Sequence, residues 1–166
     1  VYDGQVLTEH LTEREALGDV TGKKLLHLQC HFGQDTLSWA RLGAEVTGID
    51  FSDNGLKKAR GFATELGIEA RFIQSNILEL DQKLDEQFDI VFTSYGTIGW
   101  LPDINKWAQI IRKMLKPDGV FLIAEFHPYF SQIDQKSRFS TIIFLRIILT
   151  KKPRNTPIPM GLLILL

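Results

Sequence analysis

Several side chains that could bind a ligand follow apolar segments of the sequence. Residues 25–28 are mostly leucine, which is typical of a buried strand, and Gln29–Gly33 must then turn the chain sharply into a helix. Asp50 ends the next apolar segment. The number of residues between Gly33 and Asp50 is close to roughly 20. In doubly wound sheets, a carboxylate at about this separation from the glycine-rich loop binds a ribose hydroxyl. This spacing predicts the first half of a nucleotide-type binding site.

Apolar periodicity predicts the elements that position these side chains. Strands are expected over residues 25–28, 45–50, 70–73, 88–92 and 120–124. Helices are expected over residues 8–17, from Gly33 to Gly43, from the N-cap Ser52 to Gly67 and from Pro102 to Leu115. The first of these helices would lie over the sheet edge or the ligand, and a turn is expected at Lys116–Gly119. The alternation predicts an α/β fold: a doubly wound, mainly parallel sheet with helices on both faces.

In such a sheet the ligand sits outside the carboxyl ends of the strands, at the point where the strand order reverses. Polar residues lie at or just after the expected strand ends, at Gln29–Gly33, Asp50, Asn76, Ser94–Gly96 and Glu125–His127. Their common position predicts one shared site. Alternative interpretations are a helix cap for Asp50 and a turn residue for Asn76.

We expect a single domain over residues 1–166. Its 166 residues are 44% hydrophobic and 23% charged, which suits one globular unit with a real core. Within it, 1–22 would be an N-terminal lid or edge segment, 23–128 a ligand-binding core and 129–166 an abbreviated C-terminal segment. The apolar runs Thr141–Leu149 and Gly161–Leu166 of this C-terminal segment are interpreted as closing strands.

Charge and cysteine content disfavour several classes of partner. The chain has 19 basic and 20 acidic residues, a net charge of -1, and no dense Lys/Arg block to track a phosphate backbone. The single cysteine, Cys30, excludes an internal disulfide and a cysteine-built metal site. There is no signal-peptide pattern and no apolar run long enough to cross a bilayer. We expect a cytoplasmic monomer or homodimer with no metal, membrane or nucleic-acid partner.

Five motifs in order resemble those of the class I S-adenosylmethionine-dependent methyltransferases of the bacterial small-molecule type. They are HLQCHFG, GIDFS, FIQSN, FDIVFTSYG and LKPDGVFLIAEFHP, within roughly Gly18 to Pro128. The resemblance implies a Rossmann-like fold that binds S-adenosylmethionine, transfers its methyl group to a small-molecule acceptor and releases S-adenosylhomocysteine.

The resemblance also implies a set of cofactor-binding residues: Gln29, His31, Gly33, Asp50, Phe51, Ser52, Asn76, Ile77 and Ser94. Asp50 would bind the ribose, Phe51 would flank the adenine, and the Asn76 carbonyl would accept from the adenine amino group. The sequence departs from the family in its first loop. The family's acidic strand residue and first two loop glycines are replaced by His27, Gln29 and His31.

The lost glycines discriminate between cofactors. A dinucleotide needs a close backbone approach to its pyrophosphate, which the His31 side chain would obstruct, whereas S-adenosylmethionine has no phosphate. Methyl transfer depends mainly on alignment, and a base is useful only if the acceptor must lose a proton. The candidate bases at strand ends are Glu125, His127 and Tyr95. Two alternatives stay open: a non-catalytic binder of S-adenosylmethionine or S-adenosylhomocysteine, and a nicotinamide-dependent oxidoreductase.

Overall fold

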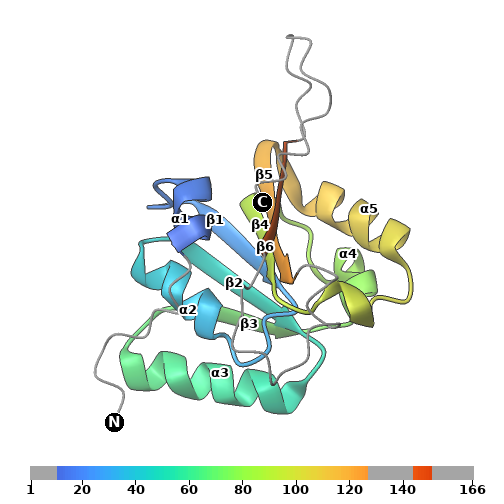
Figure 1. Ribbon diagram of the computed structural model, residues 1–166. Helices are drawn as coiled ribbons and strands as arrows, with labels where there is room; N and C mark the ends of the chain where they lie inside the picture. Colours follow the sequence, from blue (N-terminus) through green and yellow to red (C-terminus); the bar gives the residue numbers. More distant parts are fainter. Residues whose placement is uncertain (1–10, 127–143, 151–166) are drawn as a thin grey trace, which may run out of the picture.

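The computed structural model describes residues 11–126 and 144–150. Their helices are α1 (Leu11–Leu17), α2 (Gln34–Arg41), α3 (Asp53–Leu66), α4 (Leu80–Lys83) and α5 (Ile104–Met114), with 3-10 turns η1 (Ile77–Glu79) and η2 (Ile98–Trp100). The strands are β1 (Lys24–Leu28), β2 (Glu45–Asp50), β3 (Arg71–Gln74), β4 (Phe88–Ser94), β5 (Leu115–Phe126) and β6 (Phe144–Thr150). Figure 1 shows them as one twisted sheet between helices.

The sheet has the strand order β3-β2-β1-β4-β5-β6. The first five strands pair in parallel, and β6 pairs antiparallel to β5. The order reverses between β1 and β4, which places the switch point of the fold at the carboxyl end of β1. The predicted doubly wound, mainly parallel sheet is therefore confirmed.

Helices cover both faces of the sheet because its strands are apolar on both sides. Neighbouring residues of β1 point into opposite layers: Leu25 packs with Trp39 of α2, and Leu26 belongs to the layer that contains Trp107 of α5. Figure 1 shows α2 and α3 on one side of the sheet and α4 and α5 on the other. Side chains of both apolar layers pack against β1 and β4. This packing fixes the position of the strand ends.

The ends of α3 follow the predicted N-cap and terminal glycine, whereas α5 begins two residues after the predicted start at Pro102, with Asp103 as its N-cap. The Ser52 hydroxyl accepts from the N–H of Gly55 at 3.1 Å at the start of α3, and Gly67 ends that helix in the left-handed conformation, with φ 64°. Asp103 caps α5 by accepting from the N–H of Lys106 at 2.9 Å. Local sequence is sufficient to set these ends.

The turn predicted at Lys116–Gly119 is wrong as a separate element, because these residues lie within β5. The ladder pairs Phe88 with Leu115 and then Ile90 with Val120, so the residues between bulge out of register. Lys116 closes the bulge by donating to both carboxylate oxygens of Asp89 at 2.8 Å. The long-range ion pair joins this segment to the strand, which local turn propensity does not reveal.

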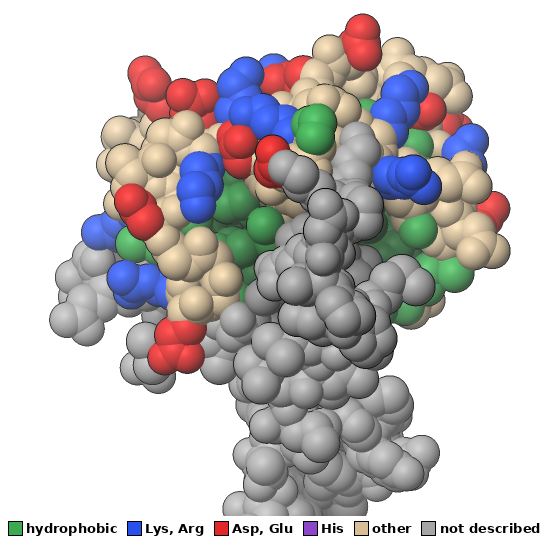
Figure 2. Space-filling model, turned by 90° about the horizontal axis from the view of Figure 1, so that it is seen from above, with side chains coloured by type: hydrophobic (Ala, Val, Ile, Leu, Met, Phe, Trp, Pro, Cys, Tyr) green, Lys and Arg blue, Asp and Glu red, His purple; other side chains and the backbone are tan. Residues whose placement is uncertain are grey.

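At the C-terminal side, one of the two predicted closing strands is observed. β6 overlaps the apolar run Thr141–Leu149, while Gly161–Leu166 lies outside the described residues. Within the described ranges, no helix is long and apolar enough to cross a membrane. On the face shown in Figure 2, Lys and Arg side chains are interspersed with Asp and Glu. The absence of a nucleic-acid partner stays a prediction.

Candidate functional site

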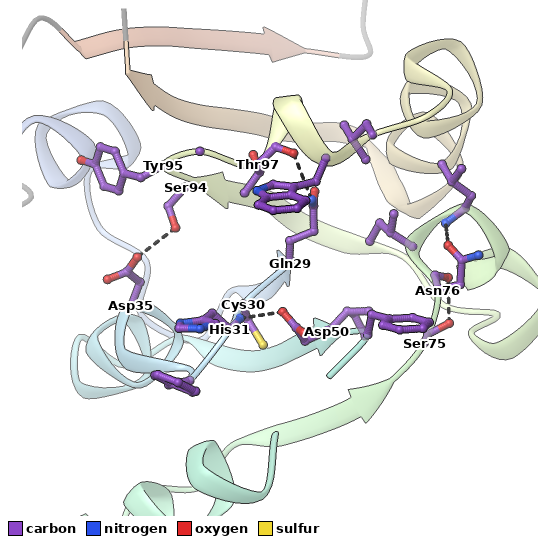
Figure 3. A pocket seen from close by; sticks show the side chains of 18 of the residues that line it. Gln29, Cys30, His31, Asp35, Asp50, Ser75, Asn76, Ser94, Tyr95 and Thr97 are labelled. Atoms are coloured by element: carbon purple, nitrogen blue, oxygen red, sulfur yellow. Dashed lines mark hydrogen bonds between the residues drawn. The ribbon is translucent and has the colours of Figure 1, made fainter. Parts of the chain in front are cut away.

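A cavity of about 670 Å³ lies at the carboxyl ends of β1, β2 and β4. Figure 3 shows its polar side chains pointing toward one another from these strand ends. Eight of the residues selected from sequence line it: Gln29, His31, Asp50, Phe51, Asn76, Ile77, Ser94 and Tyr95. Three others, Gly33, Ser52 and Glu125, are not in the lining, and His127 lies outside the described residues.

The loop after β1 contains two non-glycine residues in the left-handed conformation. Gln29 has φ 56° and His31 has φ 52°, a region that costs an L-residue roughly 1–2 kcal/mol. Hydrogen bonds to β2 hold the loop: the N–H of Cys30 donates to the carbonyl of Ile49 at 2.9 Å, and the N–H of His31 donates to Asp50 Oδ2 at 2.8 Å. The backbone thus keeps a glycine-type turn without two of its glycines.

Gly33 serves packing instead of the cavity. Its φ is 71°, and a Cβ at this position would come within 2.8 Å of the Phe72 ring and 2.9 Å of the Ala59 Cβ. A side chain here would force the start of α2 away from α3 and β3.

Asp50 is fixed in the middle of the cavity lining. Its Oδ2 accepts from His31 N–H and its Oδ1 accepts from Ser52 N–H, both at 2.8 Å. Each carboxylate oxygen has a second lone pair, so the carboxylate can also accept from two neighbouring hydroxyls of a ligand. This geometry suits a ribose.

Gln29 offers an acceptor that the protein does not use. Its Nε2 donates to the carbonyl of Thr97 at 3.2 Å, whereas Oε1 is buried and no described residue donates to it. A buried acceptor without a donor costs about 1–3 kcal/mol.

Phe51 and Asn76, which follow β2 and β3, both line the cavity. Phe51 is 77% exposed, which leaves its ring available for stacking. Asn76 Oδ1 accepts from the N–H of Leu78 at 3.1 Å and caps η1. The predicted adenine contact would use the second lone pair of that oxygen.

Glu125 holds the loop that follows β4. Its carboxylate accepts from the N–H groups of Gly96, Thr97 and Ile98, the last two at 3.0 and 3.3 Å. The side chain is only 9% exposed. By accepting from three consecutive backbone N–H groups, the Glu125 carboxylate orders one wall of the cavity.

Tyr95 links the same loop to α1. Its hydroxyl donates to Oε1 of Glu13, which is 1% exposed. Burial and the Glu13 carboxylate raise the pKa of the Tyr95 hydroxyl above its ordinary value, so the phenol stays protonated at neutral pH. Burial and Asp50 likewise raise the pKa of the Cys30 thiol to about 12, which makes this cavity residue a poor nucleophile.

A buried network connects β1 to the cavity through Ser94. His27 is 1% exposed, with Nδ1 2.8 Å from the Thr36 hydroxyl and Nε2 3.2 Å from the Ser94 hydroxyl. Ser94 donates to Asp35 Oδ2 at 2.9 Å. Sequence reasoning missed Asp35; its signal was an acidic residue in the first turn of the helix that follows the loop.

The charge of the lining is one-sided. Two acidic residues, Asp35 and Asp50, face the cavity, and none of the described residues that line it is Lys or Arg. The site therefore suits a neutral or cationic ligand better than a phosphate.

Comparison with known proteins assigns the fold to a family. Residues 19–155 match the family model of a methyltransferase domain. The chain belongs to this family. The match confirms the resemblance to class I S-adenosylmethionine-dependent methyltransferases that the five motifs indicated.

The methyltransferase domain is similar to curated ubiquinone biosynthesis O-methyltransferases. It is 32% identical to that of Salmonella paratyphi A, over 89% of this chain and 57% of the relative. It is 30% identical to that of Proteus mirabilis, over 86% of this chain and 56% of the relative. The chain thus spans slightly more than half the length of these curated relatives.

Solved methyltransferase structures share the fold. An S-adenosylmethionine-dependent methyltransferase from Mesorhizobium loti has a TM-score of 0.62 at 25% identity, over 77% of this chain and 57% of that one. The glycopeptide N-methyltransferase MtfA has a TM-score of 0.65 at 22% identity, over 80% and 59%. These likenesses establish the Rossmann-like methyltransferase architecture.

Proposed function

We propose that the protein transfers a methyl group from S-adenosylmethionine to a small-molecule acceptor and releases S-adenosylhomocysteine. The observation that carries this proposal is the Asp50 carboxylate, fixed by two backbone N–H groups at the centre of a cavity without basic side chains among its described lining residues. Family membership supports the same reaction.

The lining argues against a nicotinamide dinucleotide. A pyrophosphate is commonly met by close backbone approach at glycines or by basic side chains. His31, whose N–H binds Asp50, has a side chain where a dinucleotide site needs glycine, and the described lining has no Lys or Arg. An adenosyl sulfonium carries positive charge and no phosphate, so Asp35 and Asp50 favour it electrostatically.

Within this site the residues take separate roles. When bound, S-adenosylmethionine supplies a methyl group activated by its positive sulfur. Asp50 would accept from the ribose hydroxyls, and Phe51 would stack on the adenine. Alignment of this kind can supply about 7–11 kcal/mol of the barrier.

The acceptor side would be formed by the loop after β4. Trp100 of η2 is 85% exposed and lines the cavity, and Tyr95 lines it with its hydroxyl on Glu13. Glu125 would act by ordering this loop, and Tyr95, whose raised pKa keeps its phenol protonated, is a poor general base. The aromatic wall and the O-methyltransferase relatives favour an aromatic hydroxyl compound as the acceptor.

The test is calorimetric titration of the chain with S-adenosylmethionine, S-adenosylhomocysteine and NAD, followed by transfer of a radiolabelled methyl group to a panel of catechols, phenols and amines. We expect the first two to bind, NAD to remain silent, and at least one acceptor to become labelled. Cofactor binding without labelling of any acceptor would favour a non-catalytic binding protein. A folded chain that binds only NAD would overturn the proposal.

A further inference from the structure

The Gln29 side chain joins the two loops that wall the cavity. Gln29 follows the last residue of β1, and its Nε2 donates to the carbonyl of Thr97, 68 positions away in the loop after β4, at 3.2 Å. Figure 3 shows this side chain reaching from the end of β1 to Thr97. A glycine at position 29 would have no side chain to make this bridge. The contact therefore depends on a residue that departs from the family's loop.

On the cofactor side, the backbone that follows Gln29 is tied to β2 and to the carboxylate proposed to bind the ribose. The N–H of Cys30 donates to the carbonyl of Ile49 at 2.9 Å, and the N–H of His31 donates to Asp50 Oδ2 at 2.8 Å. A ligand held by Asp50 would therefore also fix the backbone from which the Gln29 side chain extends.

On the acceptor side, the bridge ends on a residue that organises the loop after β4. Thr97 is 6% exposed, its N–H donates to Glu125 Oε2 at 3.0 Å, and its hydroxyl lies 3.2 Å from the hydroxyl of Thr93. Trp100, which lines the cavity, lies three residues further along the same loop. Contacts at Thr97 thus decide how firmly this wall of the cavity is held.

The bridge forms against two opposing terms. Gln29 has φ 56°, in the left-handed region that disfavours a residue with a side chain. Its Oε1 is buried, and no residue in the described ranges donates to it. Strained residues of this kind are concentrated at functional sites. A bridge held under these conditions is close in free energy to an open form, so a ligand that fixes the loop can shift the balance toward the bridged form.

We propose that Gln29 is a positioning residue that couples the two walls of the cavity. A cofactor bound at Asp50 fixes the backbone of Gln29, strengthens the bridge to Thr97 and thereby orders the loop of Trp100 for the acceptor. This inference rests on the proposed function. By thermodynamic linkage, an acceptor that orders the loop strengthens cofactor binding by the same factor.

The test measures amide hydrogen exchange by NMR with and without saturating S-adenosylhomocysteine. In the wild-type chain, the ligand should slow exchange of the Thr97 and Ile98 N–H groups about fivefold or more. Gln29→Met keeps the length of the side chain without its donor, and there the slowing should be less than about twofold. The N–H of Cys30, on the cofactor side, should be slowed equally in both chains.

Gln87→Met is the matched control. Gln87 is exposed, lies outside the cavity lining and also donates from Nε2 to a backbone carbonyl, that of Lys113, at 3.3 Å. This variant should respond to the ligand as the wild type does. Gln29→Gly is the second test variant, because it removes the bridge and also suits the left-handed backbone, so it reports on the coupling even if Gln29→Met does not fold.

Three results would overturn the inference and leave the proposed function standing. They are equal slowing of the loop amides in the wild type and a Gln29 variant, no slowing in a wild-type chain that binds S-adenosylhomocysteine, and an equal loss of slowing in Gln87→Met. A folded wild-type chain that does not bind S-adenosylhomocysteine would overturn both.

Discussion

The two sides of the cavity are held by contacts of different range. On the β1–β2 side, Asp50 binds the N–H of His31, a residue 19 positions away within one strand–helix–strand unit. On the β4 side, Tyr95 binds Glu13, 82 positions away, and the next residues bind Glu125 of β5. The cofactor side is thus built locally, whereas the proposed acceptor side depends on distant elements meeting in the folded chain. A methyltransferase can change its acceptor through such a loop without disturbing its cofactor wall.

The largest expected effect comes from Glu125→Ala. Three N–H groups of the loop would lose their acceptor, and since one unsatisfied buried donor costs about 1–3 kcal/mol, we expect the free energy of unfolding to fall by about 3 kcal/mol. Urea denaturation monitored by tryptophan fluorescence measures this change.

Glu125→Gln is the matched variant, because it keeps one acceptor oxygen and should lose about half as much stability. If the alanine variant is as stable as the wild type, the loop is held by other contacts and the contrast between the two sides fails. A loss of methyl transfer in the glutamine variant that is independent of pH would favour the ordering role over a role as base.

The next largest effect is expected from Asp50→Ala, which removes a carboxylate from the β1–β2 side of the cavity. Loss of the charge-assisted ribose hydrogen bonds should weaken S-adenosylhomocysteine by about 1.5–3 kcal/mol in calorimetry. Asp53→Ala is the control, because Asp53 lies three residues further on and pairs only with Lys57 at the surface among the described ion pairs. Unchanged affinity in Asp50→Ala, or an equal loss in Asp53→Ala, would refute the assignment of the ribose contact.

The same contrast of range explains what sequence reasoning could reach. Asp50, Ser52 and Gly67 follow local rules of strand ends and helix caps, and these features appear where the sequence predicts them. The stretch after Asn76 reads as irregular, and η1 and α4 were not predicted. Their few residues carry no helical period and are fixed by packing against α5.

Features that depend on contacts between residues far apart in the chain could not be predicted from the sequence. The bulge at Lys116–Gly119 depends on Asp89, and the place of Asp35 in the site depends on Ser94, which is 59 positions away. Neither partner can be paired from spacing alone. The left-handed Gln29 and His31 are a different case, since their positions in the loop were known but side-chain propensity argues against their backbone conformation.

A smaller effect is expected at the tether between the loop and α1. Tyr95→Phe removes the donor to buried Glu13 and should lower the free energy of unfolding by about 1–2 kcal/mol near neutral pH. The raised pKa of Tyr95 means that the unfolded chain loses this proton first, so wild-type stability should fall as the pH rises above about 10. Chemical denaturation between pH 8 and 12 should show this decline in the wild type and less of it in Tyr95→Phe. If stability declines equally with pH in the wild type and in Tyr95→Phe, Tyr95 is not the cause of the decline.

The smallest change tests the strain on the local side. Glycine at position 31 would relieve a left-handed conformation that costs roughly 1–2 kcal/mol, against the roughly 0.5–1 kcal/mol that glycine adds in chain entropy. His31→Gly should therefore raise the free energy of unfolding by about 0.5–1 kcal/mol, whereas Glu65→Gly on the exposed face of α3 should lower it by about 1 kcal/mol. Denaturant titration of both variants separates backbone strain from a general effect of glycine. A destabilised His31→Gly would mean that contacts of the imidazole outweigh the strain, and parallel titration with S-adenosylhomocysteine would then decide whether those contacts also bind the cofactor.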